Sequence, residues 1–222
     1  MEQTASHEIH NPDLLTLIPV ESKKIIEIGS SSGALAREFK HISPNSDWVG
    51  VEVDASYSEL SKRYCDKSLA LDIESASENF WKEFSDRDCW IFGDVLEHLK
   101  DPWAILKNVR KIIPKNGVIV ACIPNMQHWS MIARLGIGDL RYEDFGLLDK
   151  THLRWFTRQT IIEMFDQSGF KIDAHIPRIF NEANRELFLP VIEQIAKFSN
   201  IDPQIAISDS LPLQYVVRAS LK

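Results

Sequence analysis

Apolar residues along the chain form short continuous runs that are separated by stretches with helical spacing. Runs at residues 25–28, 48–54, 68–73, 88–93 and 118–123 predict five buried strands. Between the runs, apolar residues recur three and four positions apart, as at Leu35, Phe39 and Ile42, which predicts amphipathic helices. Strands and helices that follow one another in this way predict a mostly parallel sheet covered by helices.

Two further strands are predicted near the end of the chain, where apolar and polar residues alternate one by one. They cover residues 170–176 and 213–221, and such alternation is typical of strands with one solvent-facing side. We therefore expect an antiparallel pair at one edge of the sheet. Between these strands, residues 183–199 predict one helix with Pro190 in its first turn. The expected inward face of this helix is formed by Val191, Ile195 and Phe198.

The first strand runs into a turn of small residues, Gly29 to Gly33. A turn of this kind between a strand and a helix directs backbone N–H groups toward a ligand at the helix N-terminus. The carboxylate of Glu27 is predicted to face the same place. A site with this acid beside it suits a cationic ligand without phosphate.

Three known patterns compete for this turn. A dinucleotide-binding loop needs G-x-G-x-x-G, but its second and third glycines are missing here, and Glu27 would repel a diphosphate. A nucleophile elbow needs G-x-S-x-G, and residues 29–33 match it with Ser31 as nucleophile. The third pattern is acid-x-G-x-x-x-G, which is carried by Glu27, Gly29 and Gly33. It resembles the class I S-adenosylmethionine-dependent methyltransferases. In that family the acid lies near the ammonium of the methionine moiety.

Acidic residues end the next two strands. Glu52 follows Gly29 by 23 residues, where a carboxylate can accept hydrogen bonds from both hydroxyls of a ribose; the alternative is a strand end at the surface. The resemblance implies that Asp72 contacts the adenine amino group and that Ile73 stacks on the ring. One departure is Ser31, which replaces the family's middle glycine and would weaken the loop if its φ were positive. The predicted cofactor-binding residues are Glu27, Gly29, Ser30, Ser31, Gly33, Glu52, Val53, Asp72, Ile73, Gly93 and Asp94.

The segment after the fourth strand resembles the corresponding segment of small-molecule methyltransferases, which implies a place beside the transferred methyl group. Asp94, Glu97 and His98 are spaced so that a helix would carry all three on one face. Two carboxylates and an imidazole can hold a divalent ion, as a similar segment is thought to do in some quinone-pathway methyltransferases. The alternatives are that Glu97 and His98 brace the segment, or that His98 is a general base.

Residues 125–156 are rich in aromatic and polar side chains and lack a clear period. Such a segment after a central strand is typical of a substrate lid, and the resemblance implies that it covers the acceptor. His128, Tyr142 and His152 are candidates for binding or deprotonating an acceptor hydroxyl, unless these side chains close the core. The candidate catalytic residues are therefore His98, His128 and His152.

Composition restricts the partners. The 222 residues carry a formal charge of −7 with scattered Lys and Arg, so no nucleic-acid partner is predicted. Cys65, Cys89 and Cys122 are unclustered and are predicted to be reduced core thiols. No apolar run reaches the ~18 residues of a membrane span, and the N-terminus has no basic-then-apolar signal. We therefore expect a cytoplasmic protein without membrane insertion.

The residues and the resemblance together predict a single class I methyltransferase domain over residues 1–222. Its expected fold is α/β, a Rossmann-like three-layer sandwich with a seven-stranded, mostly parallel sheet, the last strand antiparallel and helices on both faces. The expected additions are an N-terminal helical extension (1–22), the lid (125–156) and a helical insertion (178–210). The insertion is a candidate homodimer or lid element.

The implied reaction uses S-adenosylmethionine and yields S-adenosylhomocysteine. The expected acceptor is a small molecule, methylated on a hydroxyl of a sugar, quinone or natural product. A serine hydrolase based on Ser31 and a noncatalytic S-adenosylmethionine-binding module remain as alternatives. A dehydrogenase is disfavoured because none of the four tyrosines has a lysine four residues later.

Overall fold

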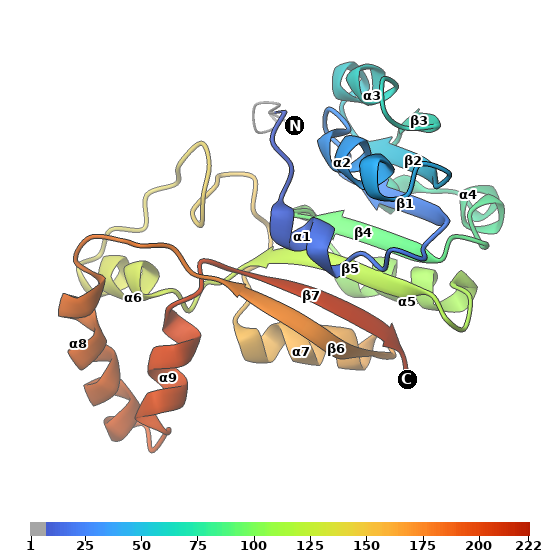
Figure 1. The fold of residues 1–222 in the computed structure, drawn as a ribbon. Helices are drawn as coiled ribbons and strands as arrows, with labels where there is room; N and C mark the ends of the chain where they lie inside the picture. Colours follow the sequence, from blue (N-terminus) through green and yellow to red (C-terminus); the bar gives the residue numbers. More distant parts are fainter. Residues whose placement is uncertain (1–7) are drawn as a thin grey trace.

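The apolar runs of the sequence form the strands of one seven-stranded sheet, as the ribbon in Figure 1 shows. The computed structural model describes residues 8–222. The strand order is β3-β2-β1-β4-β5-β7-β6, and β7 runs opposite to the other six strands. The strands are β1 (Lys24–Ile28), β2 (Asp47–Glu52), β3 (Lys67–Ala70), β4 (Cys89–Gly93), β5 (Val118–Pro124), β6 (Phe170–Arg178) and β7 (Gln214–Leu221). The predicted sheet with a reversed last strand is confirmed.

Helices cover both faces because alternate side chains of each buried strand point to opposite sides. Ile26 and Ile28 of β1 pack toward α4, α5 and α7, whereas Ile25 packs toward α1 and α2. The helices are α1 (Pro12–Leu17), α2 (Ala34–Ile42), α3 (Ala55–Ser61), α4 (Glu78–Glu83), α5 (Pro102–Ile112), α6 (Trp129–Gly136), α7 (Arg158–Gln167), α8 (Arg185–Phe198) and α9 (Pro203–Ser210). Two short 3-10 helices, η1 (Ile73–Ser75) and η2 (Leu96–His98), follow β3 and β4. No helix in the described part of the chain is long and apolar enough to cross a membrane.

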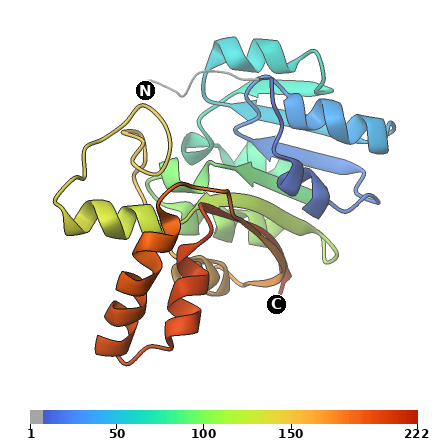
Figure 2. The same ribbon diagram turned by 60° about the vertical axis from the view of Figure 1, so that its left-hand side comes forward.

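The three cysteines are free and buried, as predicted. The third strand is shorter than its apolar run predicts, because the side chain of Asp72 accepts a hydrogen bond from the backbone N–H of Glu74 and starts η1. The region expected to be an irregular lid contains a regular helix, α6, and residues 137–157 rise beside it (Figure 2). Of the predicted N-terminal extension, residues 1–7 lie outside the described residues.

The helix prediction for residues 183–199 was wrong about the inward face. Ile192 and Ala196 are the buried residues of α8, whereas Val191, Ile195 and Phe198 are 49%, 47% and 85% exposed. The reason is that α8 packs against α6 and α9 and has apolar residues on two sides, so periodicity alone does not identify the buried one. Pro190 lies in the helix interior rather than in the first turn, and the second helix of the insertion, α9, was not predicted.

Asn125 joins the end of β5 to the segment that leads into β7. Its side chain is fully buried, and its Nδ2 donates hydrogen bonds of 2.8 Å to the carbonyl oxygens of Asp209 and Pro212. Its Oδ1 accepts a 3.1 Å bond from the backbone N–H of Gln127. The carboxyl edge of the sheet, the start of the lid and the end of the insertion therefore meet at one residue.

We predict that Asn125→Ala lowers the free energy of unfolding by about 2–4 kcal/mol, because it leaves two buried carbonyl oxygens without their donor. Urea unfolding followed by tryptophan fluorescence measures this loss. The control is Asn116→Ala in an exposed turn, for which we expect a change within about 0.5 kcal/mol. A loss at Asn125 no larger than that of the control would contradict the anchoring role.

Candidate active site

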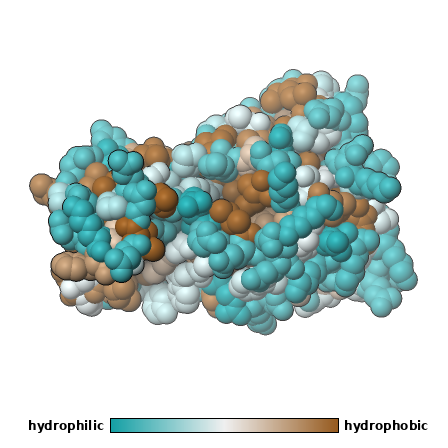
Figure 3. Space-filling view, turned by 90° about the horizontal axis from the view of Figure 1, so that it is seen from below, coloured by the Kyte–Doolittle hydropathy of each residue, from teal (hydrophilic) through white to brown (hydrophobic). Residues whose placement is uncertain are grey.

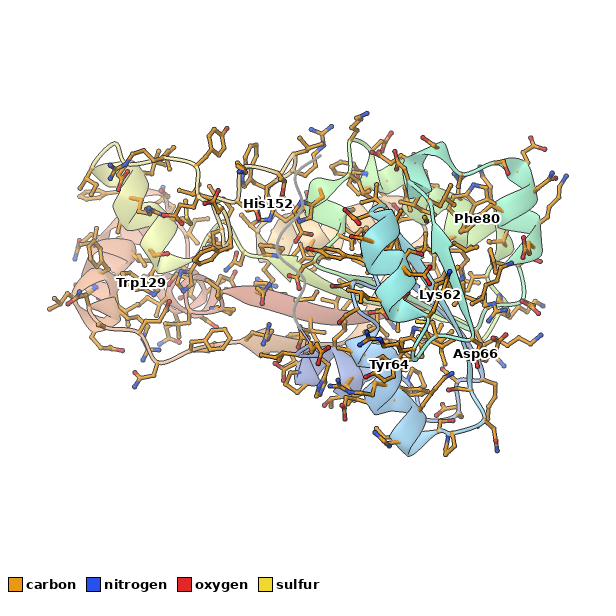
Figure 4. The ribbon with its side chains drawn as sticks, turned by 90° about the horizontal axis from the view of Figure 1, so that it is seen from above. Lys62, Tyr64, Asp66, Phe80, Trp129 and His152 are labelled. Atoms are coloured by element: carbon orange, nitrogen blue, oxygen red, sulfur yellow. The ribbon has the colours of Figure 1, made fainter. Side chains whose placement is uncertain are left out.

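The carboxyl ends of the central strands open into one cavity of about 470 Å³. It lies where the strand order reverses between β1 and β4, the place at which open parallel sheets form ligand sites. Residues from α1 and from the lid also line the cavity. Seen from above, His152 lies between the lobe that carries Trp129 and the part of the molecule that carries Lys62 (Figure 4).

The turn after β1 takes its shape from backbone conformations that favour glycine. Gly29 and Gly33 have φ values of 76° and 80°. A Cβ on Gly29 would lie 2.4 Å from Cγ2 of Val95, and one on Gly33 would lie 3.2 Å from the backbone of Ser61. Ser31 also has a positive φ, 45°, which is unfavourable for a residue with a side chain. The turn therefore needs an interaction that offsets this strain.

Glu52 supplies that interaction. Its side chain is 2% exposed, and Oε2 accepts a hydrogen bond of 2.9 Å from the backbone N–H of Ser31. Oε1 accepts a 2.7 Å bond from the N–H of Val53. Since β1 and β2 pair in parallel, with Ile28 beside Val51, the two strand ends lie next to each other. The acid predicted to bind a ribose thus also holds the glycine turn in place.

Glu27 is a second buried acid of the cavity. Its Oε2 accepts a 3.1 Å hydrogen bond from the indole N–H of Trp48, and the side chain lines the cavity. Burial raises the pKa of its carboxyl from an ordinary value of 4.5 to about 8; the bond from Trp48 opposes this rise and the charge of Glu52 adds to it. A cationic group in the cavity would favour the ionised form of Glu27.

The predicted cofactor-binding residues lie together, with one exception. All of them except Gly33 line the cavity, and Gly33 instead allows close packing against α3. Ile73 is buried and Val53 is half exposed beside the cavity, so both present apolar surface for a ring. The hydroxyl of Ser30 is buried and has no hydrogen-bond partner among the described residues. It lies against Gly50, where a Cβ would come within 2.7 Å of it.

A cluster of Glu97, His98 and His152 occupies the other end of the cavity. Their ligand atoms lie within 4.8 Å of one another, and Nε2 of His152 is 4.0 Å from Oε1 of Glu97. The lid reaches this place because the carbonyl oxygen of Glu97 accepts hydrogen bonds from the N–H groups of Leu153 and Arg154, at 2.8 and 2.9 Å. Glu97 is 1% exposed, and neither of its carboxyl oxygens has a hydrogen-bond partner in residues 8–222.

The hydrogen bonds around the two histidines assign their tautomers. The hydroxyl of Thr151 donates to Asp149, so Nδ1 of His98 is the donor toward the carbonyl oxygen of Thr151, at 3.2 Å. Nδ1 of His152 faces the carbonyl oxygen of Leu147 at 3.4 Å and is likewise the donor. Each Nε2 therefore keeps a free lone pair, which is the arrangement of imidazoles that ligate metal or accept a proton.

Burial controls the charge of this cluster. It raises the pKa of Glu97 well above the usual range, and the charge of Asp94 adds to that rise. It lowers the pKa values of His98 and His152, so both imidazoles are neutral near pH 7. A carboxyl group without partners beside two neutral imidazoles can bind a divalent cation, and the imidazoles alone can act as general bases.

Asp94 does not take part in this cluster, contrary to the expectation of a helical face shared by Asp94, Glu97 and His98. Its φ is 54°, and the side chain accepts a hydrogen bond from Nε2 of Gln214. The segment forms a turn followed by η2 instead of an α-helix, and His152 replaces Asp94 as the third ligand candidate.

His128 and Tyr142 lie outside the cavity. Both ring nitrogens of the fully buried His128 have partners, since Nδ1 lies 2.8 Å from the hydroxyl of Ser130 and Nε2 lies 3.0 Å from Oε2 of Glu182. The indole of Trp129 donates to the same carboxylate at 2.8 Å. His128 thus ties the start of α6 to the segment before α8, and the geometry does not bring it together with His98 and His152.

Sequence reasoning missed Gln214, Thr151 and the contribution of Leu14 to the cavity. Gln214 begins β7, and because β7 is antiparallel its first residue arrives at the carboxyl edge of the other strands. The predicted reversal of the last strand was the signal from which the position of Gln214 could have been inferred. Nothing in the local sequence singles out Thr151, which acts through its contact with His98.

Comparisons with known proteins identify a family for this chain. A family model described as a methyltransferase domain matches residues 5–175. O-methyltransferase 4 of Dictyostelium discoideum is 28% identical over 163 residues, which cover 72% of this chain and 45% of that protein. The ubiquinone biosynthesis O-methyltransferase of Pelagibacter ubique is 24% identical over 102 residues, which cover 46% of this chain and 42% of that protein. The chain thus spans less than half the length of these two relatives.

The fold is shared with solved structures at low sequence identity. An S-adenosylmethionine-dependent methyltransferase from Mesorhizobium loti superposes with a TM-score of 0.61 at 12% identity. The superposition covers 94% of this chain and 96% of that chain.

We predict that Glu27→Gln stabilises the protein at alkaline pH, because the amide keeps the bond from Trp48 without a buried charge. The raised pKa of Glu27 means that its ionisation costs stability, and this cost grows as the pH rises from 4.5 to about 8. The variant should unfold like the wild type near pH 4.5 and gain about 5 kcal/mol above pH 8. Urea unfolding across this range measures the difference, with the exposed Glu78→Gln as control. A constant difference at all pH values would contradict the assignment.

We predict that the chelator-treated protein binds one Zn²⁺ per chain at the Glu97 cluster. His152→Ala should weaken binding at least about tenfold, because it removes one of three ligands. Calorimetry with the metal alone measures the affinity, and His175→Ala on the exposed side of β6 is the matched control. Equal binding by both variants would place the metal elsewhere, and absence of binding would leave the cluster with an acid–base role only.

Proposed function

The chain belongs to the methyltransferase domain family, and we propose that it transfers the methyl group of S-adenosylmethionine to a hydroxyl oxygen of a small, largely apolar acceptor. The observation that carries the proposal is the pair of buried acids, Glu27 and Glu52, on either side of a glycine turn in one cavity. This pair suits a ligand with a cationic end and a ribose, and it is a poor match for a diphosphate. The resemblance assigns the ammonium group to Glu27 and the ribose hydroxyls to Glu52.

The chain's residues divide the work between the two ends of the cavity. The cofactor, when bound, supplies a methyl group activated by a sulfonium. Glu27, Glu52 and the turn hold and orient the ligand, while Asp72, Ile73 and Val53 form the expected adenine site. At the acceptor end, Nε2 of His98 or His152 takes the proton of the acceptor hydroxyl as the new C–O bond forms. The proposed products are a methyl ether and S-adenosylhomocysteine. Orientation and one base are sufficient for such a transfer.

The lining of the acceptor end favours a flat, apolar molecule over a sugar. Phe145, Leu147, Leu213 and Pro124 contribute apolar surface to the cavity near the lid. A phenol or quinol hydroxyl ionises near pH 10, within reach of a neutral imidazole, whereas sugar hydroxyls are much weaker acids. Both curated relatives are named O-methyltransferases, which agrees with an oxygen acceptor.

The serine hydrolase alternative lacks support from the geometry. The backbone N–H of Ser31 donates to Glu52, and no hydrogen bond within residues 8–222 joins Ser31 to a histidine. The carboxylate of Glu52, which accepts a hydrogen bond from the Ser31 N–H, would oppose a developing oxyanion. A binding module without catalysis has the same cofactor end, so turnover is the measurement that separates it from an enzyme.

We predict micromolar binding of S-adenosylmethionine and S-adenosylhomocysteine, weakened about 10–100-fold by Glu52→Ala, which removes charge-assisted hydrogen bonds. Calorimetric titration measures both affinities. The exposed Glu59→Ala on α3 is the control, and unfolding curves establish that each variant is folded.

Methylation of a panel of phenols and quinols then tests the acceptor, with His98→Ala and His152→Ala expected to lower kcat more than cofactor affinity. No cofactor binding by the wild type would overturn the proposal. Labelling of Ser31 by a fluorophosphonate would support the hydrolase.

A further inference from the structure

The acidic side chains of this protein are concentrated at the cavity. The whole chain has 32 acidic and 25 basic residues, which gives its formal charge of −7. Seven acids line the cavity, whereas Lys100 is the single Lys or Arg among the lining residues of the described chain. The cavity lining therefore accounts for nearly all of the excess negative charge. The seven acids are Glu27, Glu52, Asp72, Glu74, Asp94, Glu97 and Asp149.

On the exterior of the molecule, acidic and basic side chains are interspersed. Hydrophilic side chains cover much of the face that Figure 3 shows, and many surface acids lie beside a Lys or Arg. Neighbouring charges of opposite sign largely cancel each other's field, so the field that acts on a small molecule comes mainly from the cavity. Examples of such surface ion pairs are Lys24–Asp86, Lys40–Asp66 and Lys67–Glu83.

Neutral donors hold two of the carboxylates at the acceptor end. Asp149 is 4% exposed, and its Oδ1 accepts hydrogen bonds from the backbone N–H and the hydroxyl of Thr151, at 2.7 and 2.6 Å. Asp94 accepts a hydrogen bond from the side-chain amide of Gln214. Bonds of this kind stabilise an ionised carboxylate and leave its negative charge in place. The acceptor end therefore keeps negative charge beside the imidazoles.

Glu97 adds a buried carboxyl group that lacks a donor. It lines the cavity, is 1% exposed, and neither of its oxygens has a hydrogen-bond partner within residues 8–222. The 4.0 Å between its Oε1 and Nε2 of His152 is too long for a hydrogen bond. An amine on a ligand brings N–H donors to this place, whereas a ligand carboxylate brings only acceptors. A ligand with such a donor is therefore favoured at the acceptor end.

A negatively charged ligand has little to pair with in this cavity. The side chain of Lys100 is exposed, so solvent screens its charge. The cofactor of the proposed reaction brings a sulfonium and an ammonium against one carboxylate, which offsets only part of the excess. Burial of a further carboxylate beside Asp149 costs free energy, whereas a cleft lined by negative charge raises the local concentration of cations.

We propose that the acceptor is a phenol or quinol without a carboxylate or phosphate group, and that an amine on the acceptor strengthens its binding. The proposal rests on the methyl transfer proposed above and specifies the charge of its acceptor. Shape and apolar surface select a flat ring, and the acids of the cavity select among flat rings by their charge.

The test compares three catechols that differ in charge. Catechol is neutral, dopamine carries an ammonium, and protocatechuate carries a carboxylate. Calorimetry measures their binding to the full chain saturated with S-adenosylhomocysteine, in which no turnover occurs, and a chelator is present so that no metal ion offsets the carboxylates. We expect dopamine to bind at least about tenfold more tightly than protocatechuate at low ionic strength, with catechol between them, and added salt to reduce this ratio.

Asp149→Asn tests whether the cavity charge causes the preference. The amide keeps an oxygen that can accept from Thr151 but removes the negative charge, so dopamine should bind less tightly and protocatechuate more tightly. The ratio of their dissociation constants should change about threefold. A purely structural effect would weaken all three catechols alike. Asp144→Asn is the matched control, because Asp144 lies on the same lid with its side chain 84% exposed.

Each result has a defined meaning. Protocatechuate that binds as tightly as dopamine would overturn the proposal, and loss of that binding in Lys100→Gln would assign the acceptor to an anion held by Lys100. A preference that Asp149→Asn leaves unchanged, or failure of all three catechols to bind the loaded protein, would also overturn it. Absence of S-adenosylhomocysteine binding would instead overturn the proposed methyl transfer, and the loading step detects this first. Thermal unfolding shows whether each variant is folded.

Discussion

The candidate active site depends on a hydrogen bond between one buried carboxylate and a strained turn. A positive φ at a serine costs about 1–3 kcal/mol, and the bond from the Ser31 N–H to Glu52 offsets part of that cost. The same carboxylate accepts from Val53 at the end of its own strand. Turn and acid therefore form one unit, which explains how this chain keeps the turn without the middle glycine. A ligand whose hydroxyls donate to Glu52 would use the same carboxylate oxygens that accept hydrogen bonds from the turn. Ligand binding and turn geometry are therefore coupled.

Each end of the cavity holds a buried carboxyl group whose ionised form is unfavourable without a positive charge nearby. Glu27 has a raised pKa because burial opposes its charge, and Glu97 has no hydrogen-bond partner for either oxygen among the described residues. Such groups reduce stability in the empty protein and favour binding of positive charge. At the Glu27 end that charge is an ammonium in our proposal, and at the Glu97 end it is the imidazolium that forms when His98 or His152 takes the proton of the acceptor. Both ends of the cavity thus favour positive charge, but only the Glu97 end also has imidazole nitrogens.

Local sequence was sufficient for the strands, the glycine turn and most of the cofactor end, since these features depend on residues close in the chain. The acceptor end was less predictable, because it is built by contacts between distant segments. His152 reaches His98 through backbone bonds from residues 153 and 154 to Glu97 and through the contact of Thr151 with His98. His128 has the same residue type and lies in the same lid, yet its partner Glu182 holds it elsewhere. The buried side of α8 was misassigned because two apolar sides give the same period.

The antiparallel course of β7 links the insertion to the acceptor end. The chain leaves the sheet after Arg178, forms α8 and α9, and returns at Gln214, whose side chain donates to Asp94 at the cavity. Asn125 binds the returning segment, and His128 and Trp129 bind Glu182 in the departing one. The hairpin is therefore attached at both ends to the lid and remains distant from the glycine turn.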